Sequence, residues 1–467
     1  MASDQIALMA HLMRRVGVGA TRDELEALAA RPYEDVVEDL LHPERFPDED
    51  DDALDRYYPT SLSPDIPTPW AGRWLYHLVT SRGPLRHKMA LFWHHVFATA
   101  WFKSEHGPSI PAQIETFRQH GLGDLRRLLL ELSRDPAMSY WLDNCENHAG
   151  SINENYGREL LELFSMGIGN YTETDIKEAA RAFTGWTFEQ PIPLYPYGGY
   201  PTKFVFHPDD HDDGEKTFLS RTGRFDGGDI IEIIVEQEAT ARFISRHLYN
   251  YFVADEPQVP AWSVTPPQDP EAMATLMRAY RDSHADVRSV MRALLNSDFF
   301  KVARFRRVKS PAELVGGAVK LSGALDFPDP SVIGMASATA VMGQTLMDPP
   351  TVEGWHTGKE WIDGGTLTER VNFAVEQVLD PGRPGVRAIA RRLAEDGNPL
   401  SPEAFVDRCL DLAGPLAVGA ATRTALLEHA AAEGELWFEG EAARSKGEAR
   451  VARLLTLIVA APEYQFC

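Results

Sequence analysis

Residues 153–186, NENYGRELLELFSMGIGNYTETDIKEAARAFTGW, predict two short helices that carry many charged, amide and aromatic side chains. On a 100° helical wheel, one face of the first helix gathers four polar side chains: Asn155, Arg158, Glu159 and Glu162. The opposite face gathers four apolar ones: Tyr156, Leu160, Leu163 and Phe164. One face of this helix therefore packs against the protein, and the other presents a row of polar groups.

Helical periodicity continues along most of the chain. The ranges that favour helix are 4–15, 22–41, 68–80, 85–105, 110–133, 154–165, 173–183, 229–253, 270–297, 310–324, 331–346, 367–379, 385–395, 402–413, 418–433 and 441–461. Strand signals are sparse, and Lys203–His207 with Lys216–Ser220 predicts one small hairpin. The predicted fold is mainly α: a large helical domain (1–467) with an inserted loop and a small β-hairpin. An alternative division is into an N-terminal helical half (1–186), the insert (187–228) and a C-terminal helical half (229–467).

The composition is that of a globular protein, with 44% hydrophobic and 25% charged residues in 467. The formal net charge of −23 repels nucleic-acid backbones, so no nucleic-acid partner is expected, and it attracts divalent cations. No apolar run approaches the roughly 18 residues of a spanning helix, so no membrane insertion is expected. The N-terminus shows no signal peptide, and the three cysteines follow no disulfide or metal-binding pattern, which together favour a cytoplasmic location.

The polar row of the first helix has a structural explanation in part. Arg158 stands four residues after Glu154 and four before Glu162, and such opposite charges stabilise an exposed helix by about 0.2–0.5 kcal/mol per pair. Asn155 and Glu159 lie inside the helix, where capping does not explain them. Glu159 is therefore a candidate catalytic carboxylate, and Asn155 and Arg158 are candidates for binding a substrate.

Four strings of the chain resemble a large bacterial family of uncharacterised proteins: ENYGRELLEL (154–163), YTETDIKEAARAFTGW (171–186), FHPDDHDDGEKTFLS (206–220) and DPPTVEGWHTGKEW (348–361). The resemblance spans most of the chain and includes the LFWHHVF segment (91–97). Members of that family are often encoded beside secreted alkaline-phosphatase-like or sulfatase-like proteins, which implies a protein of that kind as a partner. The resemblance implies no established reaction.

The loop His207-Pro-Asp-Asp-His-Asp-Asp-Gly-Glu-Lys gathers imidazole and carboxylate groups on a turn. A divalent ion such as Mg²⁺, Mn²⁺ or Zn²⁺ would find candidate ligands there in four side chains: His207, Asp209, Asp212 and Asp213. The portion that the family shares is His211-Asp212-x-Gly-x-Lys216, and it makes His211 and Lys216 candidate catalytic groups. The alternative for the whole loop is an acidic turn that only contacts solvent.

Within the same loop, Asp209, Asp210 and Asp213 spell DDxxD. That pattern holds Mg²⁺ against a diphosphate in helical enzymes that use prenyl diphosphates. Here it lies on a predicted hairpin and no second metal motif accompanies it, so a prenyl-diphosphate enzyme is the least favoured interpretation.

The segment LRHKMALFWHHVFATAWFK (85–103) predicts a helix with two adjacent histidines, which must point to different faces. The family resemblance favours His94 over His95 as the functional residue. A neutral imidazole there would serve as a general base or as a ligand. The alternative is a histidine that is hydrogen-bonded in the core.

The second helix begins with Thr172 and Asp175, which are spaced like a capping box. Its Arg181 offers a planar fork of donors that would bind a carboxylate or phosphate of a substrate, or pair with a carboxylate of the protein. Trp186 and Trp355 would present aromatic faces to a sugar ring, or anchor the packing of their loops.

The leading hypothesis is an enzyme, a metal-assisted acid–base hydrolase or lyase that acts on a glycan or a phosphorylated small molecule. In it, Glu159 and His211 share a pocket, with His94 nearby. The alternative is a non-catalytic scaffold or binding protein with a buried polar network. The chain contains no GxSxG, Walker, GxGxxG or HExxH motif.

Overall fold

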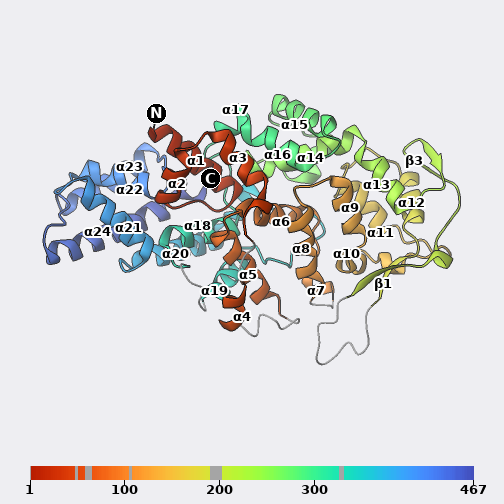
Figure 1. Ribbon diagram of the computed structural model, residues 1–467, viewed down its shortest axis with the longest axis horizontal. Helices are drawn as coiled ribbons and strands as arrows, with labels where there is room; N and C mark the ends of the chain where they lie inside the picture. The colour runs from red at the N-terminus through yellow and green to blue at the C-terminus, as the bar shows by residue number, and fades with distance from the viewer. Residues whose placement is uncertain (1, 48–50, 58–65, 105–107, 190–201, 326–330) are drawn as a thin grey trace.

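The computed structural model describes residues 2–47, 51–57, 66–104, 108–189, 202–325 and 331–467, and helices dominate them (Figure 1). Within these ranges the strands form two antiparallel pairs. The prediction of a mainly α fold is therefore confirmed. None of the described helices combines the length and the apolar composition of a membrane span.

The molecule is elongated, and α1 (Ala2–Val16) and α18 (Pro311–Ser322) lie in its middle (Figure 1). One end is built from the last four helices: α21 (Pro384–Asp396), α22 (Pro402–Leu412), α23 (Ala420–Ala432) and α24 (Glu441–Ala460). The other end contains α9 (Leu125–Ser133), α10 (Pro136–Trp141), α11 (Asn155–Glu162), α12 (Glu173–Ala182) and α13 (Gly227–Val235). The middle helix α18 packs against α5 (Pro67–Thr80), α19 (Ser331–Val341) and α20 (Gly364–Leu379).

Five of the predicted helices are each divided by a turn. The resulting pairs are α2 (Arg22–Ala29) and α3 (Tyr33–Leu41), α6 (Pro84–Val96) and α7 (Trp101–Ser104), α8 (Ser109–His120) and α9, α13 and α14 (Glu238–Phe252), and α15 (Pro270–Asp282) and α16 (Val287–Asn296). Two short helices complete the set, α4 (Asp52–Tyr57) and α17 (Asp298–Lys301). N-caps explain two divisions, since Asp124 accepts a hydrogen bond from the backbone N–H of Arg126 and Asp286 from that of Ser289.

The predicted pairing of the two strand segments is wrong. Strand β2 (Lys203–Phe206) pairs with β1 (Trp186–Glu189), and β3 (Lys216–Phe218) pairs with β4 (Arg221–Gly223). The turn between β3 and β4 is formed by Leu219 and Ser220 at φ 45° and 66°. Two residues of positive φ make a tight hairpin turn, so β3 finds its partner next along the chain before it can reach β2.

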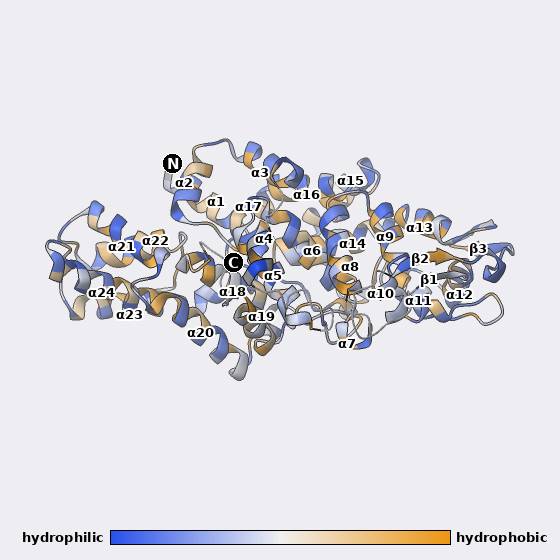
Figure 2. Cartoon of the chain, turned by 60° about the horizontal axis from the view of Figure 1, so that its bottom comes forward, coloured by the Kyte–Doolittle hydropathy of each residue, from blue (hydrophilic) through white to orange (hydrophobic). Residues whose placement is uncertain are grey.

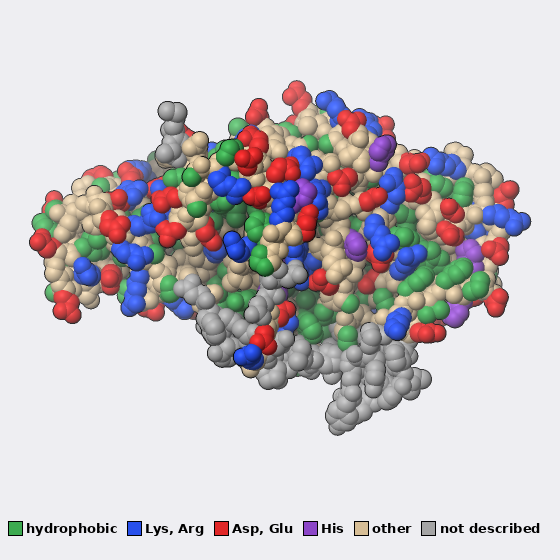
Figure 3. Space-filling view, in the orientation of Figure 1, with side chains coloured by type: hydrophobic (Ala, Val, Ile, Leu, Met, Phe, Trp, Pro, Cys, Tyr) green, Lys and Arg blue, Asp and Glu red, His purple; other side chains and the backbone are tan. Residues whose placement is uncertain are grey.

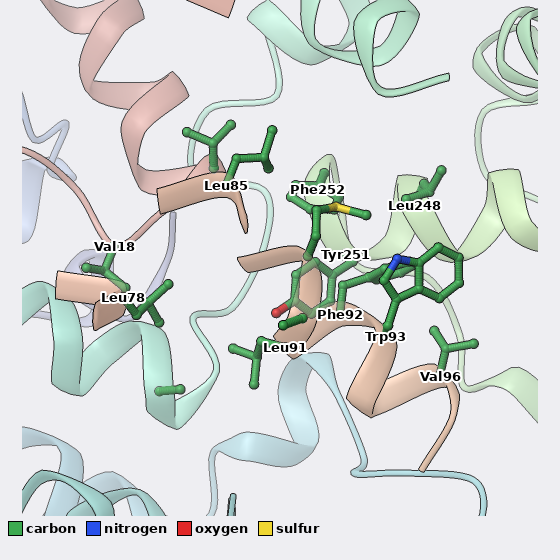
Figure 4. Packing of buried hydrophobic residues seen from close by; sticks show 14 of the residues in the cluster. Val18, Leu78, Leu85, Leu91, Phe92, Trp93, Val96, Leu248, Tyr251 and Phe252 are labelled. Carbon is green, nitrogen blue, oxygen red and sulfur yellow. The ribbon is translucent and has the colours of Figure 1, made fainter. Parts of the chain in front are cut away.

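The buried side chains form one cluster that includes residues from Met9 to Tyr464. It includes residues of α6, in which every residue but Arg86 is buried although the helix also carries polar side chains, His87, Lys88, His94 and His95. Figure 4 shows Phe92 and Trp93 of α6 packed beside Leu248 and Phe252 of α14. Most other helices carry both hydrophilic and hydrophobic residues, as helices on the surface of a core do (Figure 2).

Candidate active site

The polar row of α11 does not act as one unit, because its members have different partners. Arg158 turns outward and binds the carboxylate of Glu173 through two hydrogen bonds of 3.0 and 2.8 Å. Asn155 donates to Asp143 at 3.3 Å. Neither residue lines the cavity beside Glu162, so the geometry there does not support the predicted role of Asn155 and Arg158 in binding a substrate.

Glu159 and Glu162 form the inward part of this row, one helical turn apart. Glu162 accepts a hydrogen bond of 2.8 Å from the hydroxyl of Tyr171, which fixes its carboxylate. Burial, with smaller contributions from the negative charges of Glu162 and Glu353, raises the pKa of Glu159 to about 7 against the opposing effect of Arg158. Near neutral pH, Glu159 can therefore hold a proton.

A cavity of about 580 Å³ lies beside Glu162, between the end of α11 with the loop after it, the start of α14 and the proline-rich segment 257–267, and Glu159 is not among its lining residues. Glu162 and the exposed Glu353 both line it, and Arg242 lies on the same wall. Trp262 and Phe243 supply aromatic surface. The cavity is within the size range of small-molecule sites, and it combines apolar walls with a few polar groups, as such sites do.

Trp262 is held in place on the wall of this cavity. Its indole N–H donates to the carbonyl of Pro257 at 2.7 Å. Its ring lies 4.6 Å from the ring of His247, and the guanidinium of Arg246 is 4.6 Å from its centre. Arg246 is in turn buried and paired with Glu256 at 2.6 Å. An aromatic ring that is fixed in this way is a ready-made surface for a flat ligand.

Glu353 reaches the cavity because the next residue, Gly354, packs directly on α6. Gly354 has φ +84°, and a Cβ atom there would lie 2.4 Å from the carbonyl oxygen of His95 and 2.7 Å from its Nδ1. Only glycine adopts this conformation at such close approach without strain. Gly354 therefore fixes the position of Glu353 relative to α6.

Replacing Gly354 with alanine is expected to lower the free energy of unfolding by about 1–3 kcal/mol, since the new methyl group must displace backbone atoms of α6. Gly364→Ala is the matched control, because nothing lies within 4 Å of a Cβ atom there. Urea unfolding of both variants measures the difference. Equal stability of the two variants would show that the contact with His95 is relaxed in solution.

His94 lies in the core, close to this site but outside its cavity. Its ring is fully buried between Trp74 and Trp355, and neither ring nitrogen has a hydrogen-bond partner among the described residues. Burial lowers its pKa to about 3, with a smaller contribution from His95. His94 is thus a neutral imidazole near neutral pH, and it is not among the residues that line the cavity beside Glu162 and Glu353.

The loop at residues 207–216 forms a closed network with α12. Asp212 accepts hydrogen bonds of 2.7 and 3.1 Å from Arg181, which hold its pKa below the usual range. The backbone N–H of Asp212 donates to the hydroxyl of Thr184 at 2.8 Å. Arg181 therefore binds a carboxylate of the protein, the second of the two roles that its sequence context allowed.

His211 and Lys216 complete this network from inside the loop. His211 uses Nδ1 to donate to the backbone carbonyl of Thr184 at 2.9 Å. Lys216 is buried, and its ammonium binds the carbonyl oxygens of Asp212 and Gly214. These contacts explain the His-Asp-x-Gly-x-Lys spacing as a means of shaping a loop. The groups around His211 are not those around Glu159, so the two predicted catalytic residues lie in different surroundings.

The predicted metal ligands are dispersed. His207, Asp209 and Asp213 are exposed, Asp212 is bound by Arg181, and Asp210 pairs with His148 at 2.5 Å. Over the described ranges, no three His, Cys, Asp or Glu side chains are grouped in a way that could hold a metal ion. The donors of this loop therefore do not fit a divalent ion as they stand, and the DDxxD pattern does not face a cavity as one unit.

The two predicted aromatic binding residues are buried packing residues. Trp186 packs between Phe183 and Phe204, with ring centres 5.2 Å away in both cases. Trp355 lies between His94 and His95 and contributes to a small enclosed cavity of about 20 Å³, too small for a sugar. Trp262, Arg242 and Glu353 were not singled out from the sequence, although Glu353 stands two residues before Trp355 in the PPTVEGW string.

Comparison with known families identifies the chain, since a family model matches residues 11–466. The chain belongs to the DUF1800 family. That family is described as proteins of unknown function, so membership agrees with the resemblance and adds no reaction. The DUF1800 match includes Glu159 and every residue that lines the cavity. No curated protein and no solved structure matches the chain.

Proposed function

We propose that the protein is an acid–base enzyme that cleaves a glycan at the cavity lined by Glu162, Glu353 and Trp262, with Glu159 as the proton donor. The observation that carries the proposal is that Glu162 and Glu353 line one aromatic-walled cavity, and that the charges of both act on Glu159, which does not itself line it. Glycoside cleavage uses two carboxyl groups in opposite protonation states, and their surroundings set which one holds the proton.

The chemistry needs only side chains of this chain and water. Glu159 gives its proton to the glycosidic oxygen as the carbon–oxygen bond breaks, and Glu353 accepts a proton from the water that attacks the sugar carbon. Glu162, oriented by Tyr171, keeps negative charge near the developing positive charge of the ring. Arg242 can donate to a hydroxyl or an acidic group of the sugar.

Substitution of Trp262 tests whether the substrate is a glycan. Replacing Trp262 with alanine is expected to weaken glycan binding by roughly 2- to 12-fold, the range for loss of an aromatic contact of about 0.5–1.5 kcal/mol. Trp437→Ala is the control, because Trp437 is an exposed tryptophan outside the cavity. Release of reducing ends from a panel of neutral and acidic glycans measures cleavage, and quenching of tryptophan fluorescence measures binding.

Three outcomes of this experiment separate the alternatives. Cleavage that weakens in Trp262→Ala and not in Trp437→Ala supports the enzyme. Binding without cleavage of any glycan in the panel would instead identify a binding protein and contradict the proposed catalysis. Cleavage that is insensitive to both substitutions would place the reaction elsewhere in the molecule.

A further inference from the structure

A second cavity, of about 320 Å³, lies in the middle of the molecule, away from the three glutamates. It is enclosed by the end of α1, the α1–α2 turn, α18, α21 and the segment around Leu416, near where the C-terminus is marked in Figure 1. Five cations line it: Arg14, Arg22, Lys309, Lys320 and Arg392. Such a concentration is unexpected in a protein with a net charge of −23.

The outer three cations have carboxylate partners. Arg22 pairs with Glu26 and Asp411, both at 2.7 Å. Lys320 pairs with Glu24 at 2.9 Å. Arg392 pairs with Asp23 and Glu26. These groups are of the kind seen over the surface in Figure 3, where acidic and basic side chains are interspersed.

The inner two cations, Arg14 and Lys309, bind backbone carbonyl groups. Arg14 donates to the carbonyl of Gly414 at 2.5 Å, and its Nε is buried without a partner among the described residues. Lys309 is buried and donates to the carbonyl of Tyr464 at 2.7 Å. No ion pair joins either of them to a described carboxylate. A buried cation without a counter-charge is costly, and an unpaired buried donor adds to that cost.

Among the described residues no ion pair joins a carboxylate to Arg14 or Lys309, although Cys467, which also lines the cavity, contributes negative charge near both. Glu313 also lines the cavity, but its carboxylate is bound by Lys88 and Arg307. The guanidinium of Arg370 donates to the backbone carbonyl of Lys309 at 2.7 Å and adds a further positive charge. Among the described residues, the lining of the cavity therefore includes five cations against two acidic side chains, Asp23 and Glu313, which both have basic partners.

We infer that this cavity binds a small organic anion, whose phosphate or similar acidic group lies between Arg14 and Lys309. The lining also includes the apolar side chains of Leu321, Ile389 and Leu416, which suit the hydrocarbon part of the ligand. Burial lowers the pKa of Lys309 to about 7, opposed by the charges of Cys467 and Glu313. A bound anion would favour the charged form of Lys309, so binding should be accompanied by proton uptake near neutral pH.

Titration calorimetry with butyl phosphate, inorganic phosphate and 1-butanol tests the inference on the full chain. Butyl phosphate is expected to bind most tightly, because it alone offers both the anionic and the apolar part. Lys309→Met and Arg14→Met are each expected to weaken it at least about tenfold, as loss of a charged hydrogen bond does. Lys320→Met is the matched control and should bind normally, because Lys320 lines the same cavity but already pairs with Glu24.

Several results would overturn the inference. They are absence of butyl phosphate binding, binding of 1-butanol with equal affinity, and unchanged affinity in both Lys309→Met and Arg14→Met. Equal affinity for inorganic and butyl phosphate would contradict the organic part of the assignment. Circular dichroism of each variant checks that it is folded. These measurements do not involve glycan cleavage, so the test of the anion site is independent of the test of the proposed enzyme.

Discussion

Replacing Glu313 with glutamine is expected to lower the free energy of unfolding by about 3–5 kcal/mol, the effect of removing one partner from a buried ion pair. Glu313 lies in the first turn of α18, where it accepts a hydrogen bond of 2.7 Å from the backbone N–H of Ser310. Its other oxygen binds Lys88 and Arg307, and all three side chains are buried. Glutamine keeps the shape but leaves two cations without a counter-charge.

Urea unfolding near neutral pH measures this loss. Glu24→Gln is the matched control, because Glu24 is the corresponding first-turn glutamate of α2 and pairs with Lys320 at the surface. That exposed pair is expected to contribute no more than about 1 kcal/mol. If the two variants lost the same stability, the buried position of Glu313 would have no special importance.

The effect of Glu313→Gln also has a defined pH dependence. Burial alone would raise the pKa of Glu313, but Arg307 and Lys88 lower it well below the ordinary range. A carboxyl whose pKa is lower in the folded state stabilises the fold at pH above its unfolded pKa of about 4.3, and this contribution is lost as the pH falls below that value. The difference between wild type and variant should therefore narrow in acid.

Replacing Glu159 with glutamine is expected to lower kcat for glycan cleavage by about 10²- to 10⁴-fold, the contribution of a positioned general acid. Glutamine preserves size and hydrogen bonding but has no proton to give. Glu173→Gln is the control, since Glu173 is exposed and only pairs with Arg158. Steady-state kinetics should show normal activity in Glu173→Gln, and an active Glu159→Gln would remove Glu159 from the mechanism.

A pH series separates a catalytic role of Glu159 from a structural one. With a pKa of about 7, the wild-type rate should fall as the pH rises through that value, and this limb should be missing from residual activity of the variant. A carboxyl with a raised folded pKa destabilises the fold above that pKa. Glu159→Gln should therefore be more stable than wild type in mild alkali and lose this advantage in mild acid.

Local signals in the sequence predicted the fold class and many helix starts. Thr172 and Asp175 form the predicted capping box, because both partners lie within one turn of chain. The hairpin prediction failed because strand propensity does not say which segment a strand pairs with. Pairing β2 with β3 looked favourable from strand propensity, but the choice of partner depended on the turn at Leu219 and Ser220, neither of which is a typical residue at positive φ.

The candidate site was only half predictable. Glu159 stood out from the sequence because it lies inside a helix, where capping does not explain a glutamate. The partner of Arg158 is Glu173 of the next helix, which a helical wheel of α11 alone does not include. Glu353 and Trp262 reach the cavity from distant segments by way of a glycine contact and a proline-rich loop. Such long-range placement is decided by packing, which periodicity in one segment cannot describe.

The position of α18 in the middle of the molecule has a consequence for synthesis. Helix α5 packs on α18 and α19, α3 packs on α16, and α1 packs on α17, so these early helices bury their apolar faces against segments made much later. A nascent chain emerging from the ribosome carries those faces uncovered until the second half is translated. We therefore expect unfinished chains of this protein to need more protection from aggregation than unfinished chains of a protein whose contacts are mainly local.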